Sequence, residues 1–485
     1  MHRQKTVVLY PGLSVSHFVP MVQLADALLE KGYSVVVAVI DITTEVDTTF
    51  AAAIDRAVSS NPSVTFHKLP RVQDPPALTH GVQFLIGYLA LIRSYSQRFH
   101  DFLSSMAPGS VHAVIVDMGS VAAVGVTKNL GIPVYVFYPM GASALAVFLQ
   151  LPSIRTEGQP SFKELGDALL SFHGVPPMPA SHLLAELLEA PESEVYKLVA
   201  TGFSKNLEAN GILVNTFASL EPRAIGALMD PRLLLLPTES TMPPVYPVGP
   251  LVMGAAGEAG AAGHECIAWL DEQPEHSVVF LCFGSVMFGA KHSKEQLKEI
   301  AIGLERSGHR FLWVVRAPPH DDDPGKPLDP RADTDLDAIL PEGFLERTHG
   351  RGLVVKLWAP QVDVLHQRAT GAFVTHCGWN SVLEGVTAGV PMICWPLYSE
   401  QKMNKVFMVE EYGVGVEMVG WQQSLVKAEE VEAKVRLVME SEEGERLRAR
   451  VKAQKDAAAM AWKDGGSSRM AFGQFLSHAA ASVRV

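Results

Sequence analysis

Short apolar runs alternate with longer amphipathic stretches through the first half of the chain. Continuous Val, Ile and Leu strands are typical of parallel sheets, which are buried on both faces. The runs predicted as strands are Thr6 to Tyr10, Ser34 to Asp41, Val64 to Leu69, Ala113 to Asp117, Val134 to Tyr138 and Ile212 to Thr216. Helical patterns cover Pro20 to Lys31, Val82 to Ser104 and Gly119 to Asn129. The alternation predicts a doubly wound α/β domain.

A second alternation follows a stretch of small residues, Gly254 to Gly263, which reads as a linker. Strands are expected at Ser277 to Phe283, Phe311 to Val315, Leu353 to Leu357, Gly371 to Thr375 and Pro391 to Trp395, and helices at Lys294 to Arg306 and Glu445 to Trp462. We therefore expect Rossmann-like domains at 1–250 and 265–462, a linker at 251–264, and a C-terminal helix at 463–485 that packs back on the first domain. Ligands of such sheets bind at the carboxyl ends of the strands, so the cleft between the domains is the expected site.

The charge balance argues against nucleic acid as a partner. Lys and Arg number 40 against 52 Asp and Glu, which gives a net charge of -12. Such a surface repels a polyphosphate backbone. A small phosphorylated ligand stays open, because one helix N-terminus can hold one or two phosphates whatever the net charge.

The four cysteines, Cys266, Cys282, Cys377 and Cys394, stand singly, and none forms a Cys-x-x-Cys pair. Structural zinc and a disulfide framework are therefore not expected, and the thiols read as reduced core residues. The N-terminus lacks a long apolar signal core, and the longest apolar stretch, Val134 to Leu151, contains Pro139 and Gly141. We expect a cytoplasmic protein without a membrane span, and a monomer.

The turns that follow two of the predicted strands differ in how well their residues could bind a nucleotide. The first turn, Gly12 to His17, holds one glycine, which disfavours a dehydrogenase that binds NAD there. In the second domain, Phe373 to Thr375 runs into His376-Cys377-Gly378-Trp379-Asn380-Ser381. Asn380 and Ser381 fall where a helix begins, so their backbone N–H groups could bind a phosphate. Gly378 permits close approach of a ligand, and His376 can donate to an oxyanion. The alternative, that Asn380 or Ser381 only caps the helix, stays open here.

The segment from Trp358 to Gln401 resembles the signature box of the plant secondary-product UDP-glycosyltransferases. The match keeps these residues in register without a gap: Trp358, Gln361, His376, Gly378, Trp379, Asn380, Ser381, Glu384, Pro391, Pro396 and Glu400-Gln401. The His after the first strand, the Asp after the fourth and the Phe283-Gly284-Ser285 turn also resemble the family. The resemblance implies the GT-B fold, in which two Rossmann-like domains face each other across a cleft.

The resemblance also implies a role for each residue of the box. Trp358 would stack on the uracil and Ala359 would meet its edge through the backbone. Gln361 and Glu384 would hold the ribose hydroxyls. The implied diphosphate contacts are His376, Asn380, Ser381 and Ser285, and Gly378 belongs to the same UDP-sugar-binding set. The implied hexose contacts are Trp379, Glu400 and Gln401. UDP-glucose would be a co-substrate, with neither a cofactor nor a metal.

His17 and Asp117 are the candidate catalytic pair. Attack on an anomeric carbon by an alcohol or phenol needs a general base. His17 is expected on the loop after the first strand, and Asp117 ends a strand that should neighbour it. In the family the matching His is the base and the matching Asp orients it. Two departures stand out: Ser16 replaces the usual Gly before the catalytic His, and Met287 replaces a common Gly after Ser285.

The favoured interpretation is an inverting glucosyltransferase acting on an aromatic (flavonoid or phenolic) or terpenoid acceptor. The apolar stretches Val82 to Leu91 and Met140 to Leu149 are candidate linings of the acceptor site. C-glycosylation of a phenol is an alternative, in which the ring carbon attacks. A UDP-sugar-binding protein without transfer and a nucleotide-sugar epimerase are others.

Overall fold

The computed structural model describes residues 5–40, 48–78, 83–155, 158–230, 233, 242–252, 263–284, 292–318 and 334–482. The chain divides into two units, one made of Met1–Val252 with Met460–Val485 and the other of Met253–Ala459. The linker predicted at 251–264 lies largely outside the described residues. Each unit is built on one parallel sheet.

The first unit holds a seven-stranded sheet in the order β3-β2-β1-β4-β5-β8-β9. Every neighbouring pair is parallel. The strands are β1 Thr6–Tyr10, β2 Ser34–Ile40, β3 Thr65–Leu69, β4 Val111–Asp117, β5 Val134–Tyr138, β8 Gly211–Val214 and β9 Val245–Pro247. All five residues of β1 and of β5 are buried, as the unbroken apolar runs predict.

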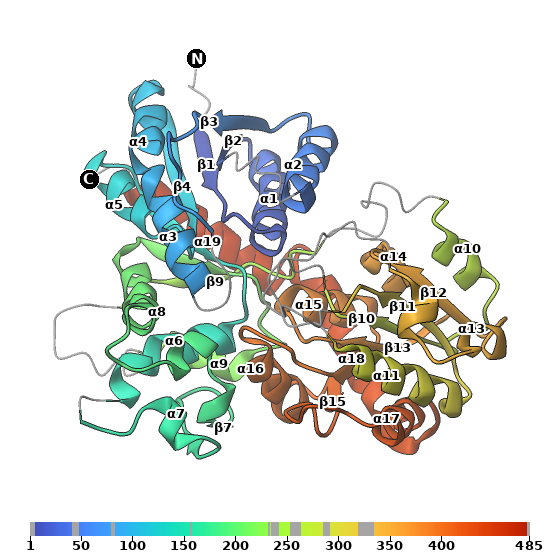
Figure 1. Ribbon diagram of the computed structural model, residues 1–485. Coiled ribbons are helices and arrows are strands. Elements are labelled where there is room, and N and C mark those ends of the chain that lie inside the picture. Colours follow the sequence, from blue (N-terminus) through green and yellow to red (C-terminus); the bar gives the residue numbers. More distant parts are fainter. Residues whose placement is uncertain are drawn as a thin grey trace. The chain divides into compact units, whose positions relative to one another are not determined.

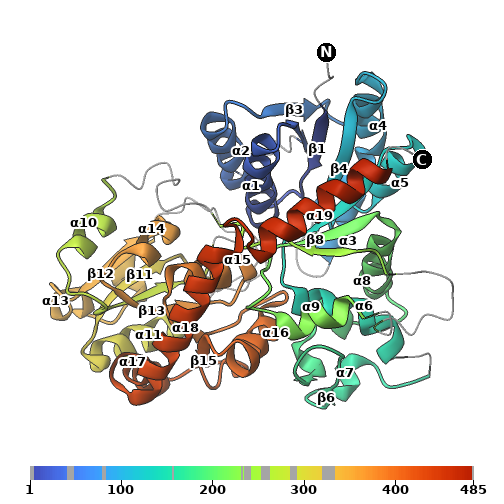
Figure 2. The same ribbon diagram turned by 180° about the vertical axis from the view of Figure 1, so that it is seen from behind.

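Helices cover both faces of this sheet: α3 and α4 lie over one face and α19 over the other (Figures 1 and 2). The helices of the unit are α1 Val15–Glu30, α2 Thr48–Ser60, α3 Gln83–Ser94, α4 Ser96–Ser105, α5 Ala122–Asn129, α6 Ala142–Ile154, α7 Phe162–Leu165, α8 Glu194–Lys205, α9 Pro222–Leu228 and α19 Ser467–Ser482. Short 3-10 turns stand at Ala180–His182, Ala185–Leu188 and Asn206–Glu208, and a small antiparallel pair joins β6 Leu169–Leu170 to β7 Met178–Pro179.

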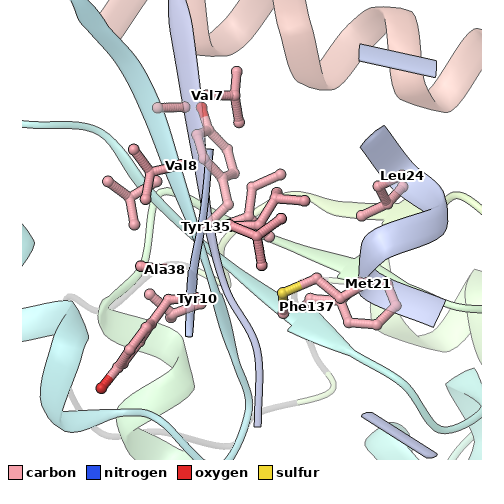
Figure 3. Close-up of a cluster of buried hydrophobic side chains, with 14 of the residues drawn as sticks. Val7, Val8, Tyr10, Met21, Leu24, Ala38, Tyr135 and Phe137 are labelled. Carbon is pink, nitrogen blue, oxygen red and sulfur yellow. The ribbon is translucent and has the colours of Figure 1, made fainter. Parts of the chain in front are cut away.

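The core of the first unit lies between the sheet and its helices. Met21 and Leu24 of α1 pack with strand side chains such as Val7, Tyr135 and Phe137 (Figure 3). The C-terminal α19 belongs to the same core through Phe472 and Phe475, and the Phe475 ring meets Tyr135 edge-on at 4.7 Å. The end of the chain is thus part of the unit that holds its beginning.

The second unit holds a six-stranded parallel sheet in the order β12-β11-β10-β13-β14-β15. Its strands are β10 Val278–Cys282, β11 Arg310–Val315, β12 Gly352–Lys356, β13 Thr370–Thr375, β14 Met392–Cys394 and β15 Gly415–Glu417. Its helices are α10 Glu265–Asp271, α11 Lys294–Ser307, α12 Leu336–Ile339, α13 Phe344–Arg347, α14 Gln361–His366, α15 Trp379–Ala388, α16 Gln401–Val406, α17 Ala428–Glu440 and α18 Glu442–Ala461, with a π-helical turn at Phe407–Glu411.

The strand order reverses at one point in each sheet. From β1 the first sheet proceeds to β2 and β3 on one side and to β4 and β5 on the other, so the reversal falls between β1 and β4. In the second sheet it falls between β10 and β13. Right-handed crossovers that leave a reversal in opposite directions place their helices on opposite faces, which opens a crevice at the carboxyl ends of these strands. In each unit, a known pair of strands therefore marks where ligands of doubly wound sheets are expected to bind.

The structure differs from the sequence predictions mainly at short elements. The helix predicted from Pro20 begins at Val15, so Pro20 lies inside α1. The expected helix from Val82 to Ser104 is divided into α3 and α4. The short strands β6, β7, β9 and β15 were not predicted. None of the described helices combines the length and apolarity that crossing a bilayer requires.

Candidate active site

His17 and Asp117 meet at the strand reversal of the first sheet. Asp117 ends β4, and β4 pairs with β1 as predicted. The Nδ1 atom of His17 lies 2.8 Å from Oδ2 of Asp117. The other carboxylate oxygen, Oδ1, accepts a hydrogen bond of 2.8 Å from the Gly119 backbone N–H. The Asp117 side chain is completely buried, whereas 22% of the His17 side chain is exposed. A buried carboxylate thus holds a half-buried imidazole through one ring nitrogen.

The position of His17 corrects the expectation that it stands on a loop. His17 occupies the first turn of α1, and its backbone N–H donates to the Ser14 carbonyl at 3.1 Å. The sequence suggested a later start because Pro20 has no N–H to donate within a helix. The helical position gives the imidazole a fixed backbone.

Tyr88 of α3 supports this pair and was not singled out from the sequence. Its hydroxyl accepts a hydrogen bond of 3.1 Å from the Leu13 N–H, in the turn between β1 and α1. A Cβ atom at Gly12 would lie 2.8 Å from Oδ1 of Asp117 and 2.9 Å from the Tyr88 hydroxyl. Burial and the nearby Asp117 charge raise the pKa of Tyr88, so its hydroxyl stays protonated. Only glycine at position 12 lets the turn, the carboxylate and the phenol approach this closely.

His376 occupies the matching place in the second sheet, directly after β13. Its side chain is 6% exposed, and its ring packs between the backbones of Gly284 and Gly378. A Cβ at either glycine would come within 2.7 Å of the imidazole Nε2. Burial, with a smaller contribution from the Arg316 charge, lowers the pKa of His376 to about 4. The imidazole is therefore neutral, and its buried Nδ1 has no hydrogen-bond partner among the residues that the structure describes.

The helix that follows begins earlier than the capping alternative requires, because its N-cap precedes both Asn380 and Ser381. Gly378 is the N-cap of α15, and no side chain caps from that position. Asn380 and Ser381 lie inside the first turn, which excludes the alternative that either of them is the N-cap. Gly378 makes room for the His376 ring, which refines the expectation that it makes room for a ligand.

Gln361 and Glu384 form a hydrogen-bonded pair with Ser381. The Gln361 Nε2 donates to Oγ of Ser381 at 2.9 Å and to Oε2 of Glu384 at 2.5 Å. These residues stand in the first turn of α14 and on α15, two helices that pack together. Burial raises the pKa of Glu384 to about 7, against the opposing effect of the Gln361 hydrogen bond. Two residues predicted to hold one ribose are thus in contact.

Trp358 and Ala359 follow β12 at the same edge of the sheet. The Trp358 side chain is 42% exposed although it is large and apolar. Its ring meets His264 edge-on at 5.6 Å. Leu357 before it has a φ of +66°, which turns the chain sharply at the strand end. The exposed indole offers a face on which a planar base could stack.

Asn404 joins the end of the box to the His376 loop, a link that the sequence did not reveal. Its side-chain amide donates to the Cys377 carbonyl at 2.9 Å and to Oε1 of Glu400 at 3.3 Å. The Gln401 Oε1 accepts from the backbone N–H groups of Leu397 and Tyr398 at 2.9 and 3.0 Å. Glu400 and Gln401 are both nearly buried, so these bonds fix their side chains.

The structure gives fewer contacts for the remaining predicted site residues. Trp379 is 3% exposed and its ring meets Tyr412 at 6.3 Å. Ser285 and Met287 lie outside the described residues. None of the four cysteines forms a disulfide, and all but Cys282 are buried. Within the ranges that the structure describes, no three His, Cys, Asp or Glu side chains come together as a metal site.

Known proteins share this chain's sequence and fold. The family model described as UDP-glucoronosyl and UDP-glucosyl transferase matches residues 232–444. An anthocyanidin 5,3-O-glucosyltransferase of Rosa hybrid cultivar is 40% identical over 95% of this chain and 96% of its own length. A phloretin 2'-O-glucosyltransferase of Pyrus communis is 40% identical over 97% of this chain and 99% of its own length. Phytolacca americana UGT2, solved with UDP-2-fluoro-glucose and pterostilbene, is similar to this chain with a TM-score of 0.84 and 32% sequence identity. The alignment covers 98% of this chain and 100% of the Phytolacca americana chain.

The chain is a plant family 1 UDP-glycosyltransferase. Its two parallel sheets are the two Rossmann-like halves of the GT-B fold. Membership confirms the resemblance drawn from the box between Trp358 and Gln401. It also makes the chain an enzyme, which excludes the binding protein without transfer.

Proposed function

We propose that this glycosyltransferase transfers glucose from UDP-glucose to a hydroxyl of a small aromatic acceptor, with inversion and with His17 as the general base. The contact between His17 and the buried Asp117 carries the proposal. Because an ionised carboxylate only accepts hydrogen bonds, it holds the proton on Nδ1 and leaves Nε2 as the basic nitrogen.

The reaction follows from this arrangement. The acceptor O–H loses its proton to Nε2 of His17 as its oxygen bonds to the anomeric carbon. The bond from that carbon to the diphosphate breaks on the opposite face, and UDP leaves with the electron pair. An α-linked donor then gives a β-glucoside. Asp117 stabilises the imidazolium formed in this step.

In the donor site, we assign roles by chemistry and contact. The exposed Trp358 indole stacks on the uracil beside Ala359, and the Gln361 and Glu384 pair holds the ribose hydroxyls. His376, Gly378, Asn380 and Ser381 at the start of α15, with Ser285, bind the diphosphate. Trp379, Glu400 and Gln401 bind the hexose. Charge on the leaving UDP then meets a neutral N–H donor and a helix N-terminus, so the reaction proceeds without a metal or cofactor.

The acceptor class rests on relatives and on one helix. The relatives carry the names of anthocyanidin and phloretin glucosyltransferases, and the Phytolacca americana enzyme was solved with pterostilbene, all aromatic acceptors. Helix α3, which carries Tyr88 beside Asp117, leaves most of its apolar side chains only half-buried. Residues 142–149 of α6 are buried, so within the stretch Met140 to Leu149 it is Met140 that is partly exposed. A flavonoid or related phenol fits an apolar helix next to a base.

A product screen tests the proposal. The enzyme is incubated with UDP-glucose and a panel of flavonoids, dihydrochalcones, stilbenes and terpenoid alcohols, and products are identified by mass spectrometry. We expect hexosides of the phenolic compounds that are hydrolysed by acid, because the new bond is to oxygen. Acid-stable products would show C-glycosylation instead. Consumption of UDP-glucose without any acceptor would contradict transfer and indicate an epimerase.

We also propose that the enzyme works as a cytoplasmic monomer, which cell fractionation and light scattering would test.

A further inference from the structure

Arg316 follows the last residue of β11 and has no assigned role. Its side chain is half-buried, and among the residues that the structure describes it has neither a hydrogen bond nor an ion pair. Other arginines of the unit are paired: Arg347 bonds Glu305 through Nε at 2.6 Å, and Arg351 bonds the Glu305 carbonyl at 3.0 Å. A partly buried cation without an acceptor is unfavourable, so a guanidinium kept in this state indicates an anionic partner that binds from outside.

The sheet places Arg316 near the start of α15. Strand β11 pairs with β10, and β10 pairs with β13, after which His376 follows. Gly284 comes two residues after β10, at the carboxyl edge between Arg316 and His376. The two outer strands are separated by about 10 Å, two strand spacings. The flexible arginine side chain covers most of that distance. Burial lowers the pKa of His376 and the Arg316 charge adds to that effect, whereas burial raises the pKa of Tyr398 and the same charge opposes it; both effects agree with a guanidinium near this edge.

Three independent features at this edge favour an anion. Helix α15 begins at this edge, where the positive end of its dipole favours an anion. Within the described part of the chain, the buried His376 leaves its Nδ1 without a partner. Arg316 adds the full positive charge that the neutral imidazole cannot supply. A single carboxylate would not engage all three, whereas two linked phosphates would.

We infer that Arg316 is a further donor-binding residue, whose guanidinium pairs with the diphosphate of the UDP-sugar on the side of Gly284 away from His376. This inference rests on the proposed function. It predicts that Arg316 distinguishes ligands that carry the diphosphate from the nucleoside alone. The uracil and ribose contacts, which involve Trp358, Gln361 and Glu384, do not depend on it.

Calorimetric titration of two ligands, UDP and uridine, tests the inference on the full-length protein. In Arg316→Gln we expect UDP affinity to fall about tenfold to a hundredfold, since hydrogen bonds to charged groups contribute about 1.5–3 kcal/mol. Uridine affinity should stay unchanged, and Arg316→Lys should restore part of the UDP affinity as a point charge. Arg310→Gln is the matched control, because Arg310 begins the same strand and bonds Gln273 instead.

The outcomes separate the inference from the function on which it rests. Unchanged UDP affinity in Arg316→Gln would overturn the inference. So would an equal loss for UDP and uridine, which would mark a structural role. A wild-type protein that binds no UDP at all would overturn the proposed function itself.

Discussion

The imidazole of His17 and the carboxylate of Asp117 are joined at 2.8 Å across the strand reversal of the first sheet, although 100 positions separate them in the sequence. Strands β1 and β4 are neighbours at the reversal, and their pairing brings the two side chains together. In addition, Gly119 fixes the second carboxylate oxygen, so Asp117 has one geometry in which to hold the ring. We expect catalysis to depend on this geometry more than on either residue's contribution to stability.

Replacing Asp117 by Asn should lower kcat by about a hundredfold to ten-thousandfold, because the amide can donate to Nδ1 and stabilise the wrong tautomer. UDP binding should be unaffected. Initial rates with UDP-glucose and a phenolic acceptor measure the effect. Asp101→Asn, at an exposed carboxylate on α4, is the control and should behave like the wild type. A rate within threefold of the wild type would show that Asp117 does not orient the base.

Replacing Gly12 by Ala should reduce activity because the new Cβ would press on the Asp117 carboxylate and the Tyr88 hydroxyl. We expect a kcat reduced about tenfold or more, with KM for UDP-glucose unchanged, since a shift of a few tenths of an ångström misaligns the base. The matched control is Gly125→Ala in α5, where a Cβ would meet none of the described neighbours within 4 Å. That change should keep activity and stabilise the helix by about 0.5–1 kcal/mol. Equal activity in both variants would contradict the packing argument.

Trp358→Ala should weaken UDP binding by about 1–3 kcal/mol, because base stacking on an indole contributes that much. The melting temperature should change little, since the side chain is 42% exposed. Trp313→Ala is the contrast: that ring is fully buried in the sheet core, and its loss should lower the melting temperature strongly. Calorimetry and thermal unfolding distinguish the two. A Trp358 variant that melts early but binds UDP normally would mean that the indole only packs.

The Glu384 carboxyl gives the donor site a pH dependence. Its pKa is raised to about 7, so between pH 4.5 and 7 the folded protein binds more protons here than the unfolded chain. Its contribution to the free energy of unfolding therefore falls as pH rises through that window. Donor affinity should move the opposite way and increase from about pH 6 to pH 8, because the ionised carboxylate accepts the ribose hydroxyl protons best.

The ligand for this titration should be UDP-glucose, since the terminal phosphate of UDP itself titrates near about pH 6. Glu384→Gln should bind UDP-glucose with the same affinity across the range. A wild-type affinity that does not change between about pH 6 and pH 8 would rule out Glu384 as the titrating acceptor.

Much of the fold followed from the apolar runs, since β1, β5 and β11 are buried on both faces and leave no polar alternation to misread. Short strands such as β15 carry too few residues for a period to be visible. Pro20 concealed the first turn of α1, and with it the helical position of His17. The pairing of His17 with Asp117 could be expected from strand order, whereas the contacts of Tyr88, Asn404 and the two glycines around His376 depend on side-chain packing that no spacing reveals.

The role of His17 as the base for transfer from a UDP-sugar is tested most directly by comparing His17→Ala with the wild type. Two assays are needed: transfer of glucose to a phenolic acceptor followed by mass spectrometry, and calorimetric binding of UDP. We predict that His17→Ala loses transfer by at least about a thousandfold and binds UDP with wild-type affinity. Transfer at a near-normal rate in that variant would show that His17 is not the base.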